Sequence, residues 1–281
     1  MAEIFLTIFF IVVLLFFLGS GIWVALSMIG VSAIGMILFT SRPVGDAMAT
    51  TIWGTSSSWT LTALPLFVWM GEILFRTKLS ENLFRGLSPW MQKLPGGLIH
   101  VNVVGCALFA AISGSSAATV ATVGKMSIPE LRKRNYPEKI LLGSLAGSGT
   151  LGLLIPPSII LIIYGVAVQE SIAKLFIAGI IPGIMIAIIF MSYVIIWSLI
   201  NKEKMPKITE KYSFLDKIKK SKQLLPVILL ITGVIGSIYT GVATATEAAS
   251  LGVVGALILS YFQKSLNFKT FKSSLLGATK T

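Results

Sequence analysis

A charge-free run of sixteen residues, 143–158, interrupts an apolar segment of membrane-spanning length and constrains the chain more than any other feature. The run holds four glycines and the Pro156-Pro157 pair. Glycine weakens a helix, and each proline removes a backbone donor. Because hydrocarbon offers no water to the carbonyls so freed, irregular backbone at membrane depth survives only inside protein or beside a polar cavity. The run therefore predicts a broken helix over residues 140–168, with backbone groups open to an ion or a substrate.

Composition places the chain among polytopic helical membrane proteins. Hydrophobic residues make up 55% of the 281 positions and charged residues only 12%, whereas a soluble domain carries about 25% charged residues. The net charge of +12 comes from Lys and Arg between the apolar runs. That placement is typical of the positive-inside rule rather than of a nucleic-acid surface. We therefore expect an all-α protein in the lipid bilayer, with no nucleic-acid partner.

The apolar runs divide the chain into three expected parts. Residues 1–97 form scaffold-like membrane helices, and their first apolar stretch, 4–39, is either one long tilted helix or two short ones. Residues 98–168 hold two interrupted elements, and residues 169–281 hold further membrane helices with a basic segment at 201–222. That segment and the basic stretch 125–139 are separated by two spans, so both lie on the cytoplasmic side.

The first interrupted element covers residues 98–124. Ser113, Gly114, Ser115 and Ser116 divide it into two arms, each too short to cross about 30 Å of hydrocarbon. We predict a re-entrant helix–turn–helix hairpin, followed by a basic loop over 125–139. Hydroxyls and freed carbonyls can bind a hard cation such as Na⁺, but small residues also serve close helix packing. Both interpretations of this turn stay open at this point.

The second interrupted element is the broken helix, where Thr150 adds a hydroxyl beside the glycines. Pro156-Pro157 makes Ile155 extended and prepares a new helix start. A helix N-terminus carries free N–H groups and partial positive charge, which favours a carboxylate or a phosphate. The alternative is a simple kink, although two prolines and four glycines exceed what a kink requires.

Few ionisable residues lie within the apolar runs. Glu247 stands between two of them, either as a functional acid at membrane depth or as an interfacial residue at a helix start, capped by Thr244 or Thr246. Glu72 fits interfacial anchoring better than chemistry. His100 is the one histidine of the sequence, and its position indicates a helix-start residue more than a catalyst.

Together these motifs resemble the large membrane subunit, DctM type, of the tripartite ATP-independent periplasmic (TRAP) transporters. The resemblance rests on five segments in the family's order: LPLFVWMGEIL (64–74), LPGGLIHVNVVGCALFAAISGSSAATVATVGKMSIPELRKRNYP (94–137), GTLGLLIPPSIILIIYGV (149–166), FIAGIIPGI (176–184) and ATATEAASLGVVGALIL (243–259). It implies an elevator-type ion-transporter fold in the inner membrane. It also implies Na⁺-driven uptake of an organic acid, of the C4-dicarboxylate or sugar-acid type, without a further cofactor and without enzymatic activity. The implied partners are a periplasmic solute-binding protein and a small four-helix membrane subunit.

In such a transporter the hairpin tip and the unwound helix line the ion and substrate sites, so residues 98–168 would be half of a transport domain. The candidate binding residues are Ser113, Gly114, Ser115, Ser116, Gly149, Thr150, Gly152, Ile155, Pro156 and Pro157, with Thr246 and Glu247. The candidate Na⁺ ligands among them are Ser113, Ser115 and the backbone carbonyls of Gly152 and Ile155.

The chain departs from the family pattern in one respect. Members contain a second, inverted repeat with its own hairpin and broken helix, and no second PP motif of this kind occurs in these 281 residues. We expect a fragment that would not transport alone, rather than a separate half-protein or a truncated product. Two other functions compete with transport: a non-permeating scaffold subunit, and an intramembrane serine hydrolase that would pair Ser113 or Ser115 with His100.

Overall fold

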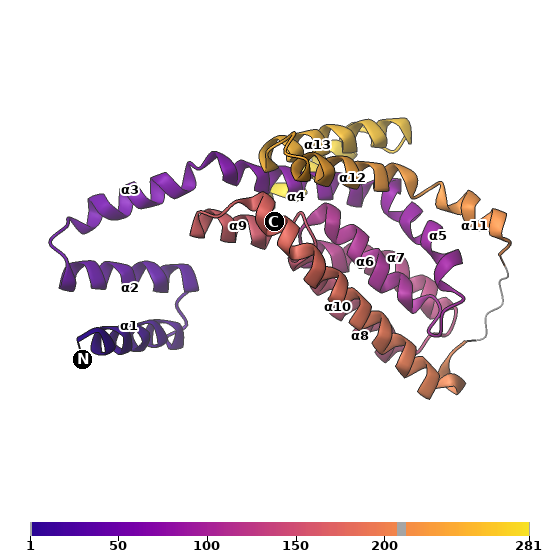
Figure 1. Cartoon of the computed structure of the whole chain (residues 1–281), viewed down its shortest axis with the longest axis horizontal. Helices are drawn as coiled ribbons and strands as arrows, with labels where there is room; N and C mark the ends of the chain where they lie inside the picture. The colour runs from indigo at the N-terminus through magenta and orange to yellow at the C-terminus, as the bar shows by residue number, and fades with distance from the viewer. Residues whose placement is uncertain (1, 207–211, 281) are drawn as a thin grey trace. The chain divides into compact units, whose positions relative to one another are not determined.

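Figure 1 shows the structure, a computed structural model that describes residues 2–206 and 212–280. All regular secondary structure in these two ranges is helical. The chain divides into two compact units, Met1–Ser58 (unit 1) and Trp59–Thr281 (unit 2). The all-α prediction is therefore confirmed, whereas the predicted functional boundaries after residues 97 and 168 stay predictions.

Unit 1 settles how the apolar stretch 4–39 folds. It forms two helices, which break at Gly21, a residue with a φ of +77°. The helices are antiparallel: the rings of Phe10 and Phe39 lie 5.8 Å apart, and a Cβ on Gly30 would lie 2.8 Å from the Phe17 ring. The helices of unit 1 are α1 (Ala2–Gly19), α2 (Val24–Phe39) and α3 (Val44–Ser56).

Unit 2 contains the interrupted elements. Its α-helices are α4 (Ala63–Arg76), α5 (Lys78–Met91), α6 (Ile99–Ser113), α7 (Ser116–Lys133), α8 (Glu138–Gly149), α9 (Ile159–Val168), α10 (Ile172–Ile200), α11 (Phe214–Ser221), α12 (Leu225–Tyr239), α13 (Ala245–Phe262) and α14 (Phe268–Lys280). Its 3₁₀ turns are η1 (Trp59–Thr62), η2 (Thr150–Leu153) and η3 (Lys202–Lys204). The predicted basic segment 201–222 includes residues 207–211, which lie outside the described residues.

The core of unit 2 joins helices that are distant in sequence. Phe67 of α4, Phe109 of α6 and Phe176 of α10 are all fully buried. The rings of Phe67 and Phe176 meet edge to face with centroids 6.4 Å apart, a geometry that aromatic quadrupoles favour. The first arm of the hairpin is thus packed between α4 and α10.

The hairpin has the predicted helix–turn–helix form, with α6 and α7 as its arms. The second arm is longer than expected, because α7 continues through Pro129 to Lys133. The prediction of a basic loop over 125–139 is therefore wrong for most of its length, and only the turn around residues 134–137 is non-helical. Of the two prolines in residues 125–139, Pro129 is accommodated within α7 and Pro137 precedes α8. Re-entry into a membrane stays a prediction.

Membrane-spanning length is met by two described helices, α10 with 29 residues and α13 with 18. The count rises to four if each of two bent helix pairs forms one span. The bent pair that lies within unit 2 consists of α11 and α12, whose axes are bent by 55° at their junction. These helices agree with an integral membrane protein.

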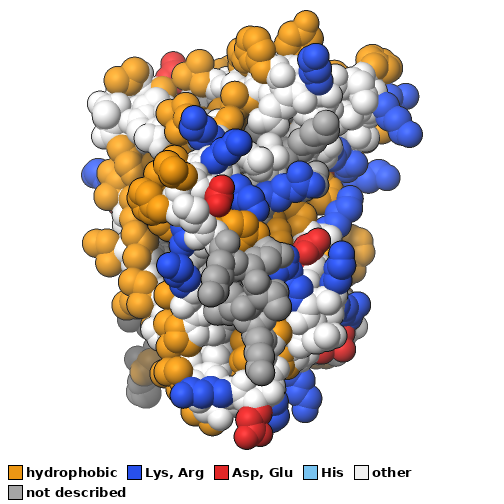
Figure 2. Space-filling model, turned by 90° about the vertical axis from the view of Figure 1, so that its right-hand side faces the viewer, with side chains coloured by type: hydrophobic (Ala, Val, Ile, Leu, Met, Phe, Trp, Pro, Cys, Tyr) orange, Lys and Arg blue, Asp and Glu red, His pale blue; other side chains and the backbone are white. Residues whose placement is uncertain are grey.

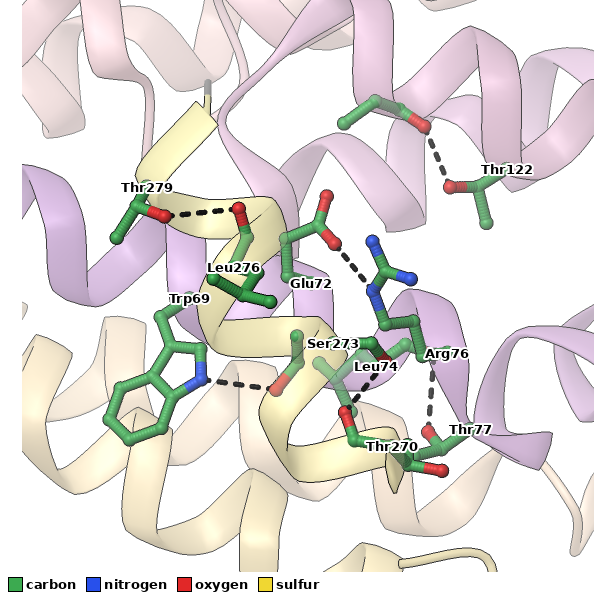
Figure 3. A network of polar contacts seen from close by, with 12 residues as sticks. Trp69, Glu72, Leu74, Arg76, Thr77, Thr122, Thr270, Ser273, Leu276 and Thr279 are labelled. Atoms are coloured by element: carbon green, nitrogen blue, oxygen red, sulfur yellow. Dashed lines mark hydrogen bonds and ion pairs between the residues drawn. The ribbon is translucent and has the colours of Figure 1, made fainter. Parts of the chain in front are cut away.

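Helices α13 and α14 both pack on α4. A Cβ on Gly252 of α13 would lie 2.5 Å from the Met70 sulfur, so the glycine permits the close approach. On α14, the Ser274 hydroxyl accepts a hydrogen bond from the Trp69 indole N–H at 3.2 Å. Nearby on α4, Glu72 forms an ion pair with Arg76 at 2.8 Å (Figure 3). Glu72 is therefore part of the α4 surface that receives α14.

The base of the hairpin is fastened by two polar side chains. His100 donates from Nε2 to the Pro95 carbonyl at 2.7 Å, which holds the turn that enters α6. The Leu98 N–H donates to the Tyr136 hydroxyl oxygen at 3.1 Å, so the entry of α6 is also joined to the turn that follows α7. Burial raises the pKa of the Tyr136 hydroxyl, and the Leu98 N–H and the Arg134 charge oppose that rise.

Tyr136→Phe is expected to lower the free energy of unfolding by about 1 kcal/mol near neutral pH, because the N–H of the buried Leu98 loses its acceptor. Because the folded-state pKa is raised, the tyrosine's contribution is present below its ordinary pKa of about 10 and is lost as the pH rises through the folded value. The apparent melting temperature across that pH range tests this. The exposed Tyr164 provides the control, as Tyr164→Phe. Equal melting temperatures for Tyr136→Phe and wild type at neutral pH would contradict the assignment.

Candidate functional site

The hairpin tip and the break in the second helix lie against each other in the structure. The Ile159 N–H, which opens α9, donates to the Gly114 carbonyl at 3.2 Å. A Cβ on Gly114 would lie 2.6 Å from the Pro157 carbonyl oxygen, and a Cβ on Gly152 would lie 2.9 Å from the Ser116 nitrogen. The two glycines therefore allow two main-chain stretches to touch directly.

The tip is built by its own hydroxyls. Gly114 ends α6 with a φ of +59°, the left-handed conformation that glycine adopts without strain. Ser115 then caps α7, because its hydroxyl accepts from the Ala118 N–H at 3.4 Å. The Ser113 hydroxyl lies 3.0 Å from the Thr119 hydroxyl and is buried. Ser113 and Ser115 thus shape the turn besides offering oxygen atoms.

The break follows from its glycines and prolines. After α8 ends at Gly149, η2 tightens the chain, and α9 starts at Ile159. Ser158 spans the gap: its hydroxyl donates to the Leu153 carbonyl at 2.7 Å and accepts from the Leu161 N–H at 3.4 Å. The break is therefore an ordered structure in which α9 has a hydroxyl cap.

The break leaves backbone acceptors open. Within residues 2–206 and 212–280, no hydrogen bond reaches the carbonyl oxygens of Gly152, Leu154 or Ile155. The cause is the proline pair, because Pro156 and Pro157 carry no N–H that could return to the preceding turn. Carbonyl oxygens of this kind are ligands for hard cations. Gly152 is buried and lies against the Ser116 nitrogen of the tip.

The structure brings most of the predicted residues together. Ser113, Gly114, Ser115 and Ser116 form the tip, and Gly152 and Pro157 contact it directly. The Ser116 hydroxyl is buried and has no hydrogen-bond partner among the described residues. Two further predicted residues of the broken helix, Gly149 and Pro156, are also buried.

Two predicted residues of the break face elsewhere. Thr150 is exposed, and its hydroxyl donates to the Gly147 carbonyl at 2.7 Å. The Ile155 side chain packs toward α10, where a Cβ on Gly183 would lie 2.8 Å from its Cγ1. For Ile155 the carbonyl is thus the group left for a ligand.

Thr246 and Glu247 belong to another part of unit 2. Glu247 completes a capping box at the start of α13: its carboxylate accepts from the Thr244 N–H and from the Thr244 hydroxyl, each at 2.8 Å. The carbonyl of the buried Thr246 accepts a hydrogen bond from the Ser250 hydroxyl at 3.0 Å. Helix α13 packs on α4 and α12. The predicted helix cap thus forms, with Thr244 as the partner of Glu247, whereas an interfacial position of Glu247 stays a prediction.

Sequence reasoning missed three glycines that frame the site from outside. A Cβ on Gly71 of α4 would lie 2.8 Å from the Ser113 Cα. A Cβ built on Gly179 of α10 would lie 2.5 Å from the Leu154 carbonyl oxygen. Gly183, one turn further along α10, lies against the Ile155 side chain. The spacing of Gly179 and Gly183 is the available signal, since residues four apart share one helix face.

The arrangement does not suit hydrolytic chemistry. His100 and Ser113 stand at opposite ends of α6, about 20 Å apart at 1.5 Å per residue. In the described ranges, no three His, Cys, Asp or Glu side chains cluster as a transition-metal site would require. The tip and the break offer neutral hydroxyls, carbonyls and helix ends instead.

Gly114→Ala is expected to destabilise the protein by at least about 1–2 kcal/mol, the cost of placing an L-residue in the left-handed region, because its Cβ would also meet the Pro157 carbonyl. Gly143→Ala in α8 is the matched control, since nothing lies within 4 Å of its Cβ position. Alanine at that helical position should be neutral or stabilising by about 0.5–1 kcal/mol. Thermal unfolding in detergent gives both values. A melting temperature for Gly114→Ala equal to that of Gly143→Ala would show that the tip–break contact does not form.

Comparison with known proteins covers nearly the whole chain. The family model described as "Tripartite ATP-independent periplasmic transporter, DctM component" matches residues 9–281. The C4-dicarboxylate TRAP transporter large permease protein DctM of Pseudomonas aeruginosa is 35% identical over 234 residues, which are 83% of this chain and 54% of that protein. The sialic acid TRAP transporter large permease protein SiaM of Vibrio cholerae is 34% identical over 244 residues, 86% of this chain and 56% of that protein.

A third relative extends the range of named substrates. The ectoine/5-hydroxyectoine TRAP transporter large permease protein UehC of Ruegeria pomeroyi is 36% identical over 205 residues, 71% of this chain and 46% of that protein. The chain spans about half the length of the curated relatives that it matches. The match of the family model over residues 9–281 and the identities above 30% show that the chain belongs to the DctM component family of the tripartite ATP-independent periplasmic transporters.

Proposed function

We propose that this chain is part of the membrane subunit of a Na⁺-coupled, binding-protein-dependent secondary transporter, which imports organic acids across the inner membrane. The observation that carries the proposal is the contact between the hairpin tip and the broken helix, at Gly114, Pro157 and Ile159. Such interrupted helices provide carbonyls and helix ends for coupling ions and substrates near the membrane midplane.

The proposed Na⁺ ligands are neutral oxygens at this contact. They are the hydroxyls of Ser113 and Ser115 and the carbonyls of Gly152 and Ile155. The open carbonyls at the break and the buried position of Ser113 support this choice. The negative ends of two helices, α6 at Ser113 and α8 with η2 at Leu153, also favour a cation there.

The proposed substrate is an anion that uses the opposite helix ends. Both α7 and α9 begin at the contact, since the first residue of α9 bonds to Gly114 and Gly152 lies against the first residue of α7. Helix N-termini favour carboxylates. Relatives are named for C4-dicarboxylates and for sialic acid, and we infer an organic acid of the dicarboxylate or sugar-acid class here.

We further infer the assembly in which this part of the chain acts. The tip and the break would lie in the moving half of an elevator-type transporter, as the first of two inverted repeats. The partners would be a periplasmic solute-binding protein and a small four-helix membrane subunit, in keeping with the word tripartite in the family description. The relatives are named as permeases, which supports transport rather than catalysis.

The whole transporter is the proper object of the functional test. A strain that produces the full-length subunit with its two partners should accumulate the radiolabelled organic acid only when Na⁺ and the binding protein are both present. Leucine substitutions at Gly114 and Gly152 should abolish uptake while the subunit still reaches the membrane. Uptake that persists without Na⁺ and without the binding protein would refute the proposal. Normal uptake with leucine at both glycines would favour a scaffold role for these elements.

Ser115→Ala and Gly152→Ala should each reduce the thermal stabilisation that Na⁺ gives the purified full-length subunit relative to K⁺. A ligand that binds the folded state stabilises it by RT ln(1 + [L]/Kd), so a tenfold weaker site loses about 1.4 kcal/mol at saturating Na⁺. The melting temperature as a function of Na⁺ concentration measures this.

Thr50→Ala serves as the control for this series, because it removes an exposed hydroxyl of α3 whose hydrogen bonds are local. It should keep the wild-type response to Na⁺. If all three variants show the wild-type Na⁺ response, the assignment of the Na⁺ ligands is wrong, although the chain could still transport.

A further inference from the structure

Helix α11 carries a ridge of three exposed apolar side chains. The ridge consists of Phe214, Leu215 and Ile218, which are 66%, 75% and 41% exposed. These three side chains share one helix face, because Ile218 lies three and four residues after the other two. Around them the sequence is strongly basic, with eight lysines in residues 201–222. An apolar ridge in such surroundings is complementary to a partner that is both apolar and anionic.

The orientation of α11 is fixed by α5. The Trp90 indole N–H donates to the Ser221 hydroxyl at 2.7 Å, and the Trp90 ring meets Phe214 edge to face with centroids 6.4 Å apart. The buried Lys217 places its ammonium 5.1 Å from the centroid of the same ring, a distance at which cation–π attraction acts. A capping box between Ser213 and Asp216 orders the start of the helix. The ridge is therefore held outward rather than free to turn inward.

Two lysines border the ridge. Lys219 and Lys222 are exposed and follow Leu215 and Ile218 by four residues, which places each beside the ridge, one turn further along. In the part of the chain that the structure describes, neither makes an ion pair. Asp216, the acid within α11, is engaged by the Ser213 N–H at 3.2 Å. Among the described residues, no ion pair thus compensates the positive charge of Lys219 and Lys222 beside the ridge.

The surroundings of α11 are basic over a wider area. Figure 2 views unit 2 from the side on which α5, α11 and the end of α10 lie in Figure 1, and Lys and Arg side chains gather there. Helix α11 also departs from the direction of the apolar helix α12 by 55°. A basic helix with an apolar face, bent away from a membrane helix, has the properties of a helix that lies in the membrane interface.

We propose that α11 is an interfacial helix that binds anionic phospholipids, with the ridge at the acyl-chain boundary and Lys219 and Lys222 on the headgroup phosphates. Lysine stems can cover apolar surface while their ammonium groups reach the headgroups. All the basic side chains around α11 would attract anionic lipids at long range. Retention of a bound lipid needs the ridge together with Lys219 and Lys222. The proposal is independent of Na⁺ coupling and of the transported substrate.

Native mass spectrometry of the purified full chain, titrated in detergent with phosphatidylglycerol or with phosphatidylcholine, tests the proposal. A lysine near a membrane surface contributes on the order of 1 kcal/mol, which is about fivefold in affinity. Lys219→Gln with Lys222→Gln should therefore weaken phosphatidylglycerol binding about 25-fold and leave phosphatidylcholine binding unchanged. Leu215→Ser with Ile218→Ser should weaken the binding of both lipids.

Two matched variants make the test specific. Lys202→Gln with Lys204→Gln removes the same charge from the same basic segment but away from the ridge, and it should retain phosphatidylglycerol to within about fivefold. Lys219→Arg with Lys222→Arg keeps the charge and should bind as wild type does, which shows that the exposed positions tolerate substitution.

Three results would overturn the proposal. The first is wild-type phosphatidylglycerol binding by Lys219→Gln with Lys222→Gln. The second is an equal loss with Lys202→Gln and Lys204→Gln, which would indicate general charge attraction. The third is displacement of bound phosphatidylglycerol by inorganic phosphate alone, which would indicate an anion site without a role for the ridge.

Discussion

Contact between two main-chain stretches, at the hairpin tip and at the break, is the feature on which the proposed site depends. Gly114 and Gly152 lie so close to Pro157 and Ser116 that no side chain fits at either glycine. The hydrogen bond from Ile159 to Gly114 fixes how the two elements meet. This contact puts the ends of four helical segments in one place, beside the carbonyls of Gly152, Leu154 and Ile155, which no hydrogen bond reaches among the described residues. A change of spacing at either glycine would separate these groups.

The chemistry available at this contact is electrically neutral. The described residues place the Glu247 carboxylate in the cap of α13 and the Glu72 carboxylate in an ion pair on α4. Hydroxyls, carbonyls and helix ends remain, and none of them carries the large desolvation cost of a buried charge. Hydroxyl and carbonyl oxygens are ligands for hard cations and can bind a monovalent cation without a buried protein charge. Partial charges of opposite sign at neighbouring helix ends would let a cation and an anion bind side by side.

The basic residues have a separate role at the edge of the structure. Their placement between apolar runs is typical of the positive-inside rule, which depends on the loop in which each residue lies and not on a particular fold of that loop. The arrangement around α11 is more specific, since Trp90 engages Phe214, Lys217 and Ser221 and leaves an apolar ridge flanked by lysines. The same charges can therefore serve orientation during insertion and lipid contact afterwards. Packing of α11 on α5 distinguishes the second role from the first.

The sequence by itself determined the helical class, the turn at Ser113–Ser116 and the break before Ile159. These features follow from local rules: apolar content, the left-handed freedom of Gly114 and the missing N–H groups of Pro156 and Pro157. Only the tertiary structure decided that the tip meets the break, that Ile155 packs toward Gly183, and that α7 runs on to Lys133. The pairing of distant segments depends on side-chain volumes and close approaches across long sequence separations, which no local pattern encodes. For the same reason the sequence left Glu247 between two roles until its Thr244 hydrogen bonds placed it in a helix cap.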